Sequence, residues 1–315
     1  MNGKSDVIVI GGATASGKSA CALDVCSALG GELISCDSMQ VYKYMDVGTA
    51  KPTKEESLRV AHHLIDIKMP YEEFSSSDYC QCAKNAIDGV ISRGRLPVIC
   101  GGTGLYLDSL MYLQNNDDTA CDKDVRERLL LNDKHENWLE LQKIDPQSAQ
   151  TIHENNVKRV VRALEIYYTT GRTKTENDKL RRSDTGKYDY HIFVISYKNR
   201  EILYERINKR VDVMLENGLL DEIKYLLDNG LLRQGTTAYQ AIGYKELISY
   251  LNSEATYEQA IEELKRATRN YAKRQITWFS RYKDAEFIYA DELGASGSVS
   301  SHVIKRIEEK GVKIG

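Results

Sequence analysis

The sequence predicts an open α/β sheet of parallel strands with helices on both faces, plus an all-helical insertion. Five short apolar runs are the expected strands, at residues 7–10, 33–36, 97–100, 191–197 and 286–290. The first three lack a clean apolar–polar alternation, which is typical of strands covered on both faces. Helical patterns at 19–29 and 77–92 separate them. This alternation of strands and helices is that of an α/β sheet.

The stretch from 114 to 190 differs because it contains no convincing strand. It is rich in helix formers and has amphipathic patterns at 124–132, 136–144 and 157–169. Its two ends have loop compositions. We therefore expect a core domain built from 1–113 and 191–315, with a helical insertion domain at 114–190.

Composition places the chain among soluble globular proteins. Hydrophobic residues make up 42% and charged residues 28%. The formal net charge of −3 argues against a uniformly basic nucleic-acid binder, although it does not describe local patches. Seven cysteines show neither a CxxC pair nor zinc spacing, so we expect reduced structural thiols. With no secretory signal pattern and no apolar membrane span, the expected location is the cytoplasm.

A phosphate-binding loop is the first chemical signal. Residues 12–19, GATASGKS, satisfy the pattern GxxxxGK[ST] between an expected strand and an expected helix. The candidate phosphate ligands are Gly12, Ala13, Thr14, Ala15, Ser16, Gly17, Lys18 and Ser19. Backbone amides and the helix N-terminus hold the anion, Lys18 neutralises charge, and Ser19 is the candidate ligand for Mg²⁺. The context makes a chance glycine-rich turn a poor alternative and predicts a fold like that of the P-loop NTPases.

Polar residues follow two other expected strands. Asp37 comes directly after a buried strand, at the same edge of the sheet as the loop. It can bind Mg²⁺ or accept a proton from a nucleophile. The alternative is a purely structural role as a helix N-cap. Thr103 follows Gly101 and Gly102 after the strand at 97–100, where its hydroxyl can bind a ligand or complete a plain turn.

The order of the sequence motifs along the chain is characteristic of one protein family. After GATASGKS come ISCDSMQVYKYMDVGTAKP (34–52), HHLID (62–66), GGTGLY (101–106) and DKDVRERL (122–129). Further along are NNVKRVVRALEIYYTTGR (155–172), RINKRVDVMLENGLLDEI (206–223), AIGYKEL (241–247) and ATRNYAKRQITWF (267–279). Together they resemble the tRNA dimethylallyltransferase family over nearly the whole chain. Ala13 departs from the proline common there, and 112–121 fits the family poorly.

The resemblance implies what the loop holds and what reacts beside it. The substrate would be dimethylallyl diphosphate, with diphosphate as the leaving group, and the acceptor would be the exocyclic N6 of the adenosine 3′-adjacent to the anticodon. Asp37 would be the general base. Lys18, Thr103, Arg210 and Mg²⁺ would stabilise the departing diphosphate. Whether ATP also binds in the loop is left open by the sequence.

The resemblance also implies the tRNA contacts. The anticodon stem-loop would be bound by Asp37, Ser38, Met39, Gln40, Thr103, Arg126, Lys158, Arg159, Val160, Val161, Arg162, Gln240, Ala241, Ile242, Gly243, Tyr244 and Lys245. Such an enzyme would flip the adenine out of its stack, and the family implies a monomer.

One segment of this slightly acidic chain is locally basic. Residues 264–283 carry seven lysines and arginines and no acid. Arg266, Arg269 and Lys273 form a stripe on one helix face, which can follow RNA phosphates, although a solvated face is the commoner reason for such spacing. For Trp278 and Phe279, buried packing is favoured over base stacking. For His62 and His63, packing is favoured over a metal site.

Two other functions fit parts of this pattern. Without the resemblance, an ATP-dependent kinase of a nucleoside-like metabolite would lead, with Asp37 as base. A non-catalytic RNA-binding P-loop protein is the second. A kinase consumes ATP, whereas the transferase needs no nucleoside triphosphate. A mere binder would tolerate loss of Asp37. The related adenylate isopentenyltransferases act on free nucleotides, and the RNA-contact segments argue against them.

Overall fold

The computed structural model describes residues 4–112, 122–183, 186–293 and 298–312, which form two compact units. The core unit comprises Met1–Leu110 with Lys187–Gly315, and the helical unit is Met111–Gly186. The expected domain boundary at 113–114 and part of the loop after it lie outside the described residues.

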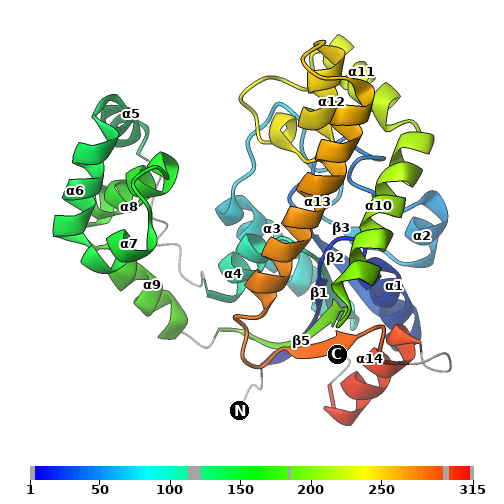
Figure 1. Cartoon of the computed structure of the whole chain (residues 1–315). Coiled ribbons are helices and arrows are strands. Elements are labelled where there is room, and N and C mark those ends of the chain that lie inside the picture. Colours follow the sequence, from blue (N-terminus) through cyan, green and yellow to red (C-terminus); the bar gives the residue numbers. More distant parts are fainter. Residues whose placement is uncertain (1–3, 113–121, 184–185, 294–297, 313–315) are drawn as a thin grey trace. The chain divides into compact units, whose positions relative to one another are not determined.

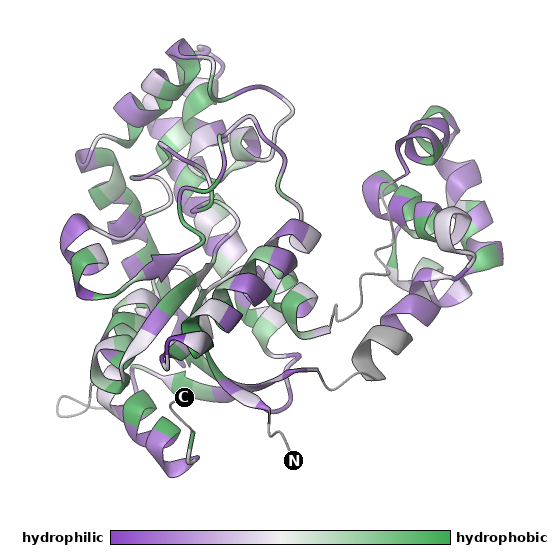
Figure 2. Ribbon diagram, turned by 180° about the vertical axis from the view of Figure 1, so that it is seen from behind, coloured by the Kyte–Doolittle hydropathy of each residue, from purple (hydrophilic) through white to green (hydrophobic). Residues whose placement is uncertain are grey.

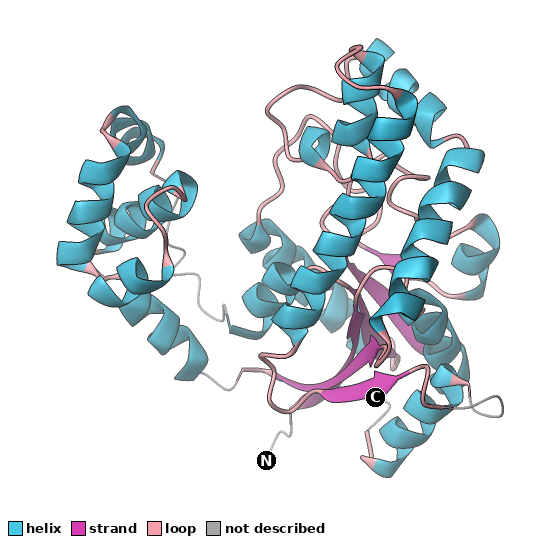
Figure 3. Ribbon diagram, viewed as in Figure 1, coloured by secondary structure: helices cyan, strands magenta, loops and turns pink. Residues whose placement is uncertain are grey.

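A six-stranded parallel sheet organises the core unit, as expected (Figure 3). Its strands are β1 (Ser5–Gly12), β2 (Gly31–Cys36), β3 (His62–His63), β4 (Leu96–Gly101), β5 (Tyr188–Ser196) and β6 (Glu286–Tyr289), in the order β3-β2-β4-β1-β5-β6. Gly101 aligns with both Gly11 and Cys36. The carboxyl ends of β1, β2 and β4 are therefore level, and the loops that follow them start side by side.

Both faces of the sheet are covered, which explains the continuous apolar strands. Ile8 and Ile10 belong to an apolar cluster that includes residues of α1 (Lys18–Leu29) and α14 (Val299–Glu309). Val7 and Val9 are equally buried and point to the opposite face, because side chains alternate along a strand. The central strands are accordingly mostly apolar in Figure 2.

The helices of the core unit include a long pair at the carboxyl end of the sheet. They are α1 (Lys18–Leu29), α2 (Lys54–Arg59), α3 (Ser76–Ser92), α4 (Gly104–Tyr112), α10 (Arg200–Glu216), α11 (Leu219–Asp228), α12 (Tyr244–Leu251), α13 (Tyr257–Phe279) and α14 (Val299–Glu309), with a 3₁₀ turn at Ala238–Gln240. α13 runs beside α10 and contacts α12 and β1 (Figure 1). A capping box formed by Thr256 and Gln259 starts α13.

The helical unit has its own core. It contains α5 (Lys123–Leu131), α6 (Lys134–Ile144), α7 (Pro146–Thr151), α8 (Val157–Thr170) and α9 (Lys174–Ser183). Leu129, Leu141 and Leu164 form the centre of its apolar cluster. Asp145 starts α7 by accepting the Ser148 amide, and proline follows at the first helical position, where its missing N–H costs nothing.

No helix in the part of the chain that the structure describes is both long and apolar enough to cross a bilayer.

Candidate active site at the carboxyl edge of the sheet

The loop after β1 has the backbone of an anion cradle. Ala15 and Gly17 have φ values of 60° and 95°, in the left-handed region that turns successive amides to one side. Gly12 is required for space, because a Cβ there would lie 2.5 Å from the Ile195 carbonyl oxygen. The Ser16 amide donates to the Ala13 carbonyl.

Four amides of this loop face no acceptor from the residues that the structure describes. Among the described residues, the N–H groups of Ala15, Gly17, Lys18 and Ser19 have no hydrogen-bond partner. Unpaired donors at the start of α1 are those that a phosphate group satisfies. The loop can therefore bind an anion without rearranging.

Lys18 links the loop to the other charged groups of the site. Its ammonium donates to the Ala13 carbonyl at 3.2 Å. Burial lowers the pKa of Lys18, and the neighbouring Arg210 guanidinium lowers it further, against the opposing influence of Asp37. Burial also lowers the pKa of Arg210, and Asp37 again opposes the shift. The charges of two cations and one carboxylate thus act on one another where β1 and β2 end.

Asp37 is not a helix cap. Its Oδ1 accepts the amides of Met39 at 2.9 Å and Gln40 at 3.4 Å, and turns rather than a helix follow it. These bonds fix the side chain and use one oxygen. The other oxygen has no hydrogen-bond partner among the described residues, so it is available to a substrate.

Thr103 is held beside Asp37 by the loop after β2. Its amide donates to the Cys36 carbonyl at 3.1 Å, and its hydroxyl accepts the Ser38 amide at 3.1 Å. A Cβ at Gly101 would lie 2.1 Å from the Cys36 carbonyl oxygen, so this close approach requires glycine. The expected convergence of the two loops is present.

Sequence reasoning missed two residues that α13 brings to this edge. Burial raises the pKa of Tyr271 to about 12, with a further rise from the Asp37 charge, while a hydrogen bond with Thr103 opposes it. Gln275 accepts the Thr14 amide at 2.8 Å and donates to the Gly102 carbonyl at 3.1 Å. Both residues lie inside the basic segment, and neither carries a charge that marks it in the sequence.

The oxygen donors near the loop suit Mg²⁺. The Ser19 hydroxyl and the Asp37 carboxylate are hard oxygen ligands, as this ion prefers. The Cys100 thiol hydrogen-bonds Ser19, but burial raises its pKa to about 11, so it stays protonated and is a poor ligand. A separate group of Asp6, Asp189 and His191 lies near the amino ends of β1 and β5, far along the strands from this edge.

The expected tRNA contacts in the core unit fall into exposed and buried groups. Gln240 and Lys245 are exposed and Ile242 is half-buried, whereas Ala241, Gly243 and Tyr244 are buried. Ser38, Met39 and Gln40 are half-buried. The Gln40 amide group is engaged by the Ser35 hydroxyl and the carbonyls of Thr49 and Ala50.

The helical unit shows the same division. Lys158 and Arg159 are exposed, but Val160 and Val161 lie in the apolar cluster of the unit. Arg126 and Arg162 each donate to the buried carboxylate of Glu165 at 2.9 Å. The side chains of Val160 and Val161, and likewise those of Ala241 and Tyr244, are buried and support the core, and the tRNA contacts expected at these four positions stay predictions.

The stripe on α13 is only partly free of acids. Arg266 forms an ion pair with Glu263, which lies one residue before the acid-free segment. Arg269 donates to Asn208 at 2.7 Å, and the Lys273 ammonium lies 5.7 Å from the Tyr204 ring centre.

The packing interpretations of the aromatic and histidine pairs are confirmed. A Cβ at Gly104 would lie 2.2 Å from the Trp278 ring, and one at Gly11 would lie 2.3 Å from Phe279. His63 bonds Glu32 at 2.7 Å, and His62 bonds the Val60 carbonyl at 2.8 Å. Trp278 packs on α4, Phe279 packs on β1 and His63 joins β3 to β2, whereas the bond of His62 is local.

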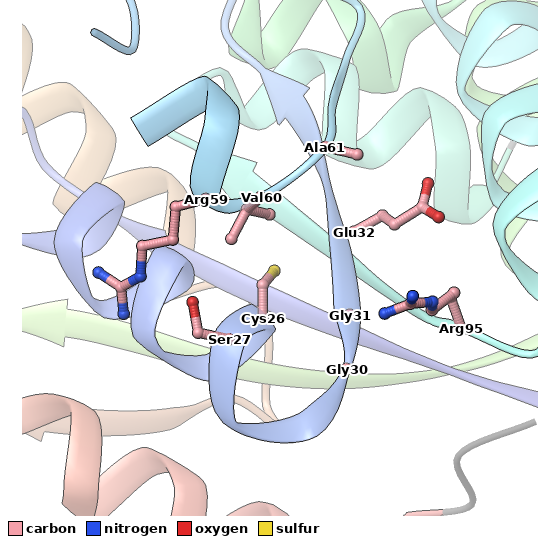
Figure 4. Close-up of a pocket in the computed structure, with 9 residues that line it drawn as sticks. All are labelled: Cys26, Ser27, Gly30, Gly31, Glu32, Arg59, Val60, Ala61 and Arg95. Atoms are coloured by element: carbon pink, nitrogen blue, oxygen red, sulfur yellow. The ribbon is translucent and has the colours of Figure 1, made fainter. Parts of the chain in front are cut away.

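A polar pocket lies at the opposite end of β2 (Figure 4). It is lined by Cys26, Ser27, Gly30, Gly31, Glu32, Arg59, Val60, Ala61 and Arg95. None of these is a candidate catalytic or binding residue, and Gly31 begins the strand that Cys36 ends. The pocket is separate from the chemistry at the carboxyl edge.

Comparisons with known proteins agree with this geometry. A family model described as IPP transferase matches residues 40–282. A tRNA dimethylallyltransferase of Caldanaerobacter subterraneus subsp. tengcongensis is 44% identical over 309 residues, 96% of this chain and 98% of that relative. One from Bacillus cereus is 42% identical over 311 residues, 98% of this chain and 96% of the relative.

Solved structures give the same result. The full-length tRNA isopentenylpyrophosphate transferase of Bacillus halodurans matches with a TM-score of 0.72 and 40% identity, covering 99% of this chain and 97% of that one. A eukaryotic dimethylallyltransferase acting on tRNA matches with a TM-score of 0.86 and 31% identity, covering 98% of this chain and 80% of that one. The chain belongs to the IPP transferase family.

Proposed function

We propose that this chain transfers the dimethylallyl group of dimethylallyl diphosphate to N6 of the adenosine 3′-adjacent to the anticodon in tRNA, releasing diphosphate. Relatives named tRNA dimethylallyltransferase, similar over nearly the whole chain, support this function. The observation that carries it is the placement of the anion loop, Asp37 and Thr103 at the level carboxyl ends of β1, β2 and β4, where the charges of Lys18, Arg210 and Asp37 act on one another.

Asp37 acts on the nucleophile. The exocyclic amine of adenine is weakly nucleophilic because its lone pair is delocalised into the ring, so it needs proton removal as the C–N bond forms. The Asp37 oxygen that receives no backbone amide accepts this proton. The two amides on the other oxygen keep the carboxylate in place.

The opposite side of the site stabilises the leaving group. As the allylic C–O bond breaks, negative charge grows on the bridging oxygen of the diphosphate. The unpaired amides of the loop, Lys18 and Arg210 form a preorganised set of donors for it. The Thr103 hydroxyl, which accepts the Ser38 amide, would turn its hydrogen from Ser38 Oγ to the diphosphate. Ser19 would hold Mg²⁺, which when bound supplies further positive charge to the diphosphate.

Exposed and half-buried polar side chains of both units would recognise the RNA. The target adenine leaves the anticodon-loop stack to reach Asp37, which costs less from a single-stranded loop than from a duplex. The exposed candidates Lys158, Arg159, Gln240 and Lys245, with Arg126 and Arg162, would contact the anticodon stem-loop. We propose that the chain acts as a monomer in the cytoplasm.

A transfer assay tests the function directly. Labelled dimethylallyl diphosphate, Mg²⁺ and an anticodon stem-loop are incubated without ATP, with the wild-type chain or with Asp37→Ala. Label in the RNA that falls at least about a hundredfold in the variant is the expected result. ATP consumption with phosphorylation of a small acceptor, and no label in the RNA, would instead establish the kinase.

A further inference from the structure

The inner face of α13 meets the substrate loops through one buried amide. Gln275 is 5% exposed, and its side chain joins two loops from different parts of the sequence. Its oxygen accepts the Thr14 amide at 2.8 Å, and its nitrogen donates to the Gly102 carbonyl at 3.1 Å. Because Thr14 offers only a donor and Gly102 only an acceptor here, a single amide orientation satisfies both.

The space around Gln275 is tailored to this contact. A Cβ at Gly102 would lie 2.0 Å from the Gln275 nitrogen, so the approach requires glycine at 102. One turn before, Tyr271 lies beside Thr103 and Asp37, and one turn after, Phe279 packs on Gly11. These side chains share one helix face, since positions four apart on a helix are neighbours.

The hydrogen bond between Gln275 and Thr14 also determines which amides of the loop are available to bind a phosphate. The Thr14 amide is committed to Gln275, and the Ser16 amide to Ala13. The amides of Ala15, Gly17, Lys18 and Ser19 stay unpaired among the described residues. Gln275 thus holds the loop in the form whose later half presents donors.

We propose that Gln275 is a positioning residue for the diphosphate. By holding Thr14 and Gly102 together, it sets the separation between the amides that bind the leaving group and Thr103, which lies beside the base. This inference rests on the proposed function, because it takes the ligand of the loop to be the diphosphate of an allylic substrate. Gln275 itself touches neither substrate.

Inorganic diphosphate is the probe that isolates this role, because its binding requires neither RNA nor turnover. In Gln275→Met, which keeps the side-chain length, Thr14 and Gly102 lose their partners. We expect about a tenfold rise in the Kd of diphosphate with Mg²⁺. The Kd of the anticodon stem-loop should stay within about twofold. Gln81→Glu on the exposed face of α3 is the matched control for the charge change below.

Gln275→Glu adds a readout that a merely structural residue would not move. An ionised carboxylate still accepts the Thr14 amide but repels the Gly102 carbonyl, whereas the protonated acid donates to it as glutamine does. The ratio of variant to wild-type diphosphate Kd should therefore be about tenfold at pH 8 and fall towards one near pH 6, because burial raises the pKa of a carboxyl. Taking the ratio cancels the titration of diphosphate itself.

Each outcome decides the inference. A folded Gln275→Met with a diphosphate Kd within twofold of wild type overturns it, as does an equal loss of diphosphate and RNA binding. If Gln275→Met fails to fold, Gln275→Glu decides. A ratio of variant to wild-type diphosphate Kd that stays near one at every pH overturns the inference. A wild-type chain that binds diphosphate but transfers no dimethylallyl to RNA refutes the proposed function instead, so the two failures are distinguishable.

Discussion

The hydroxyl of Tyr244 donates a 2.7 Å hydrogen bond to the carboxylate of Glu222. The same carboxylate accepts the backbone amides of Asp46 and Val47 at 2.7 Å and of Gly48 at 3.0 Å. A Cβ at Gly48 would lie 2.5 Å from the Tyr244 ring. The segment that begins at Asp37 is thus tied to α11 and α12 by one side chain from each.

Glu222→Gln should destabilise this segment, because the amide nitrogen of glutamine would face backbone N–H groups. We expect a loss of about 2–3 kcal/mol in the free energy of unfolding and a reduced kcat for transfer. Tyr244→Phe removes one hydrogen bond and should cost about 1 kcal/mol. Urea unfolding measures both variants. Equal stability of Glu222→Gln and wild type would contradict the role assigned to this carboxylate.

The lowered pKa of Lys18 has a pH consequence. The ammonium attracts diphosphate, and burial lowers its pKa below the ordinary value of 10.5. Affinity for inorganic diphosphate should therefore decline as pH rises, starting at lower pH than for an exposed lysine. Lys18→Met should bind diphosphate weakly and lack this alkaline limb. Isothermal titration between pH 7 and pH 10 measures it, and an unchanged limb in the variant would exclude Lys18 as its source.

Of the three cations of the α13 stripe, only Arg266 forms an ion pair among the described residues. Arg269 is hydrogen-bonded to Asn208, and the Lys273 ammonium lies beside the Tyr204 ring. If it contacts an RNA phosphate, Lys273→Gln should reduce the slope of log K against log salt by about 1. Lys305→Gln on α14 makes the same charge change away from the stripe and should leave the slope unaltered. Filter binding of the anticodon stem-loop between about 50 and 300 mM salt gives the slopes.

Glu32 should contribute stability that is lost in acid. Hydrogen bonds from Arg93 lower the pKa of Glu32 to about 2, from its ordinary value of 4.5, against the effect of burial. A carboxyl with a lowered native pKa stabilises the fold above its unfolded pKa and loses that effect as pH falls through the native pKa. Its contribution is therefore complete above about pH 5 and declines from about pH 4.5 towards 2.

Glu32→Gln tests that assignment. With allowance for the half-exposed Arg93, it should lower the free energy of unfolding by about 1–2 kcal/mol at pH 7. The difference from wild type should shrink at pH 3.5. Urea titrations at the two pH values measure it, and a difference that grows in acid would have the wrong sign for a lowered pKa.

The sequence predicted those elements whose signal is local. The apolar runs at 7–10, 33–36 and 97–100 lie inside β1, β2 and β4, because a strand buried on both faces needs apolar residues throughout. β3 was missed, since His62 and His63 form a two-residue strand with no apolar run. α7 was missed because it is a six-residue helix whose start depends on one capping aspartate.

The site was predictable where a motif follows a strand. Lys18, Asp37 and Thr103 each come just after a strand, and parallel strands bring those positions together. Glu222 and Gln275 were not predictable, because the backbone groups that they bind lie 173 or more residues away in the chain. Glu222 resembles any acid in the first turn of a helix, and Gln275 any polar residue among lysines and arginines. Only folding reveals what such a side chain meets.

The placement of β1 between β4 and β5 has a consequence for biosynthesis. β1 emerges first from the ribosome, yet its full pairing needs β5, which follows the whole of Met111–Gly186. At roughly 5–20 residues per second, translation of Met111–Gly186 alone takes about 4–15 s. The helical unit has its own apolar cluster and can mature during this interval. The nascent β1 edge meanwhile awaits its partner, so chaperone demand should peak just before β5 is translated.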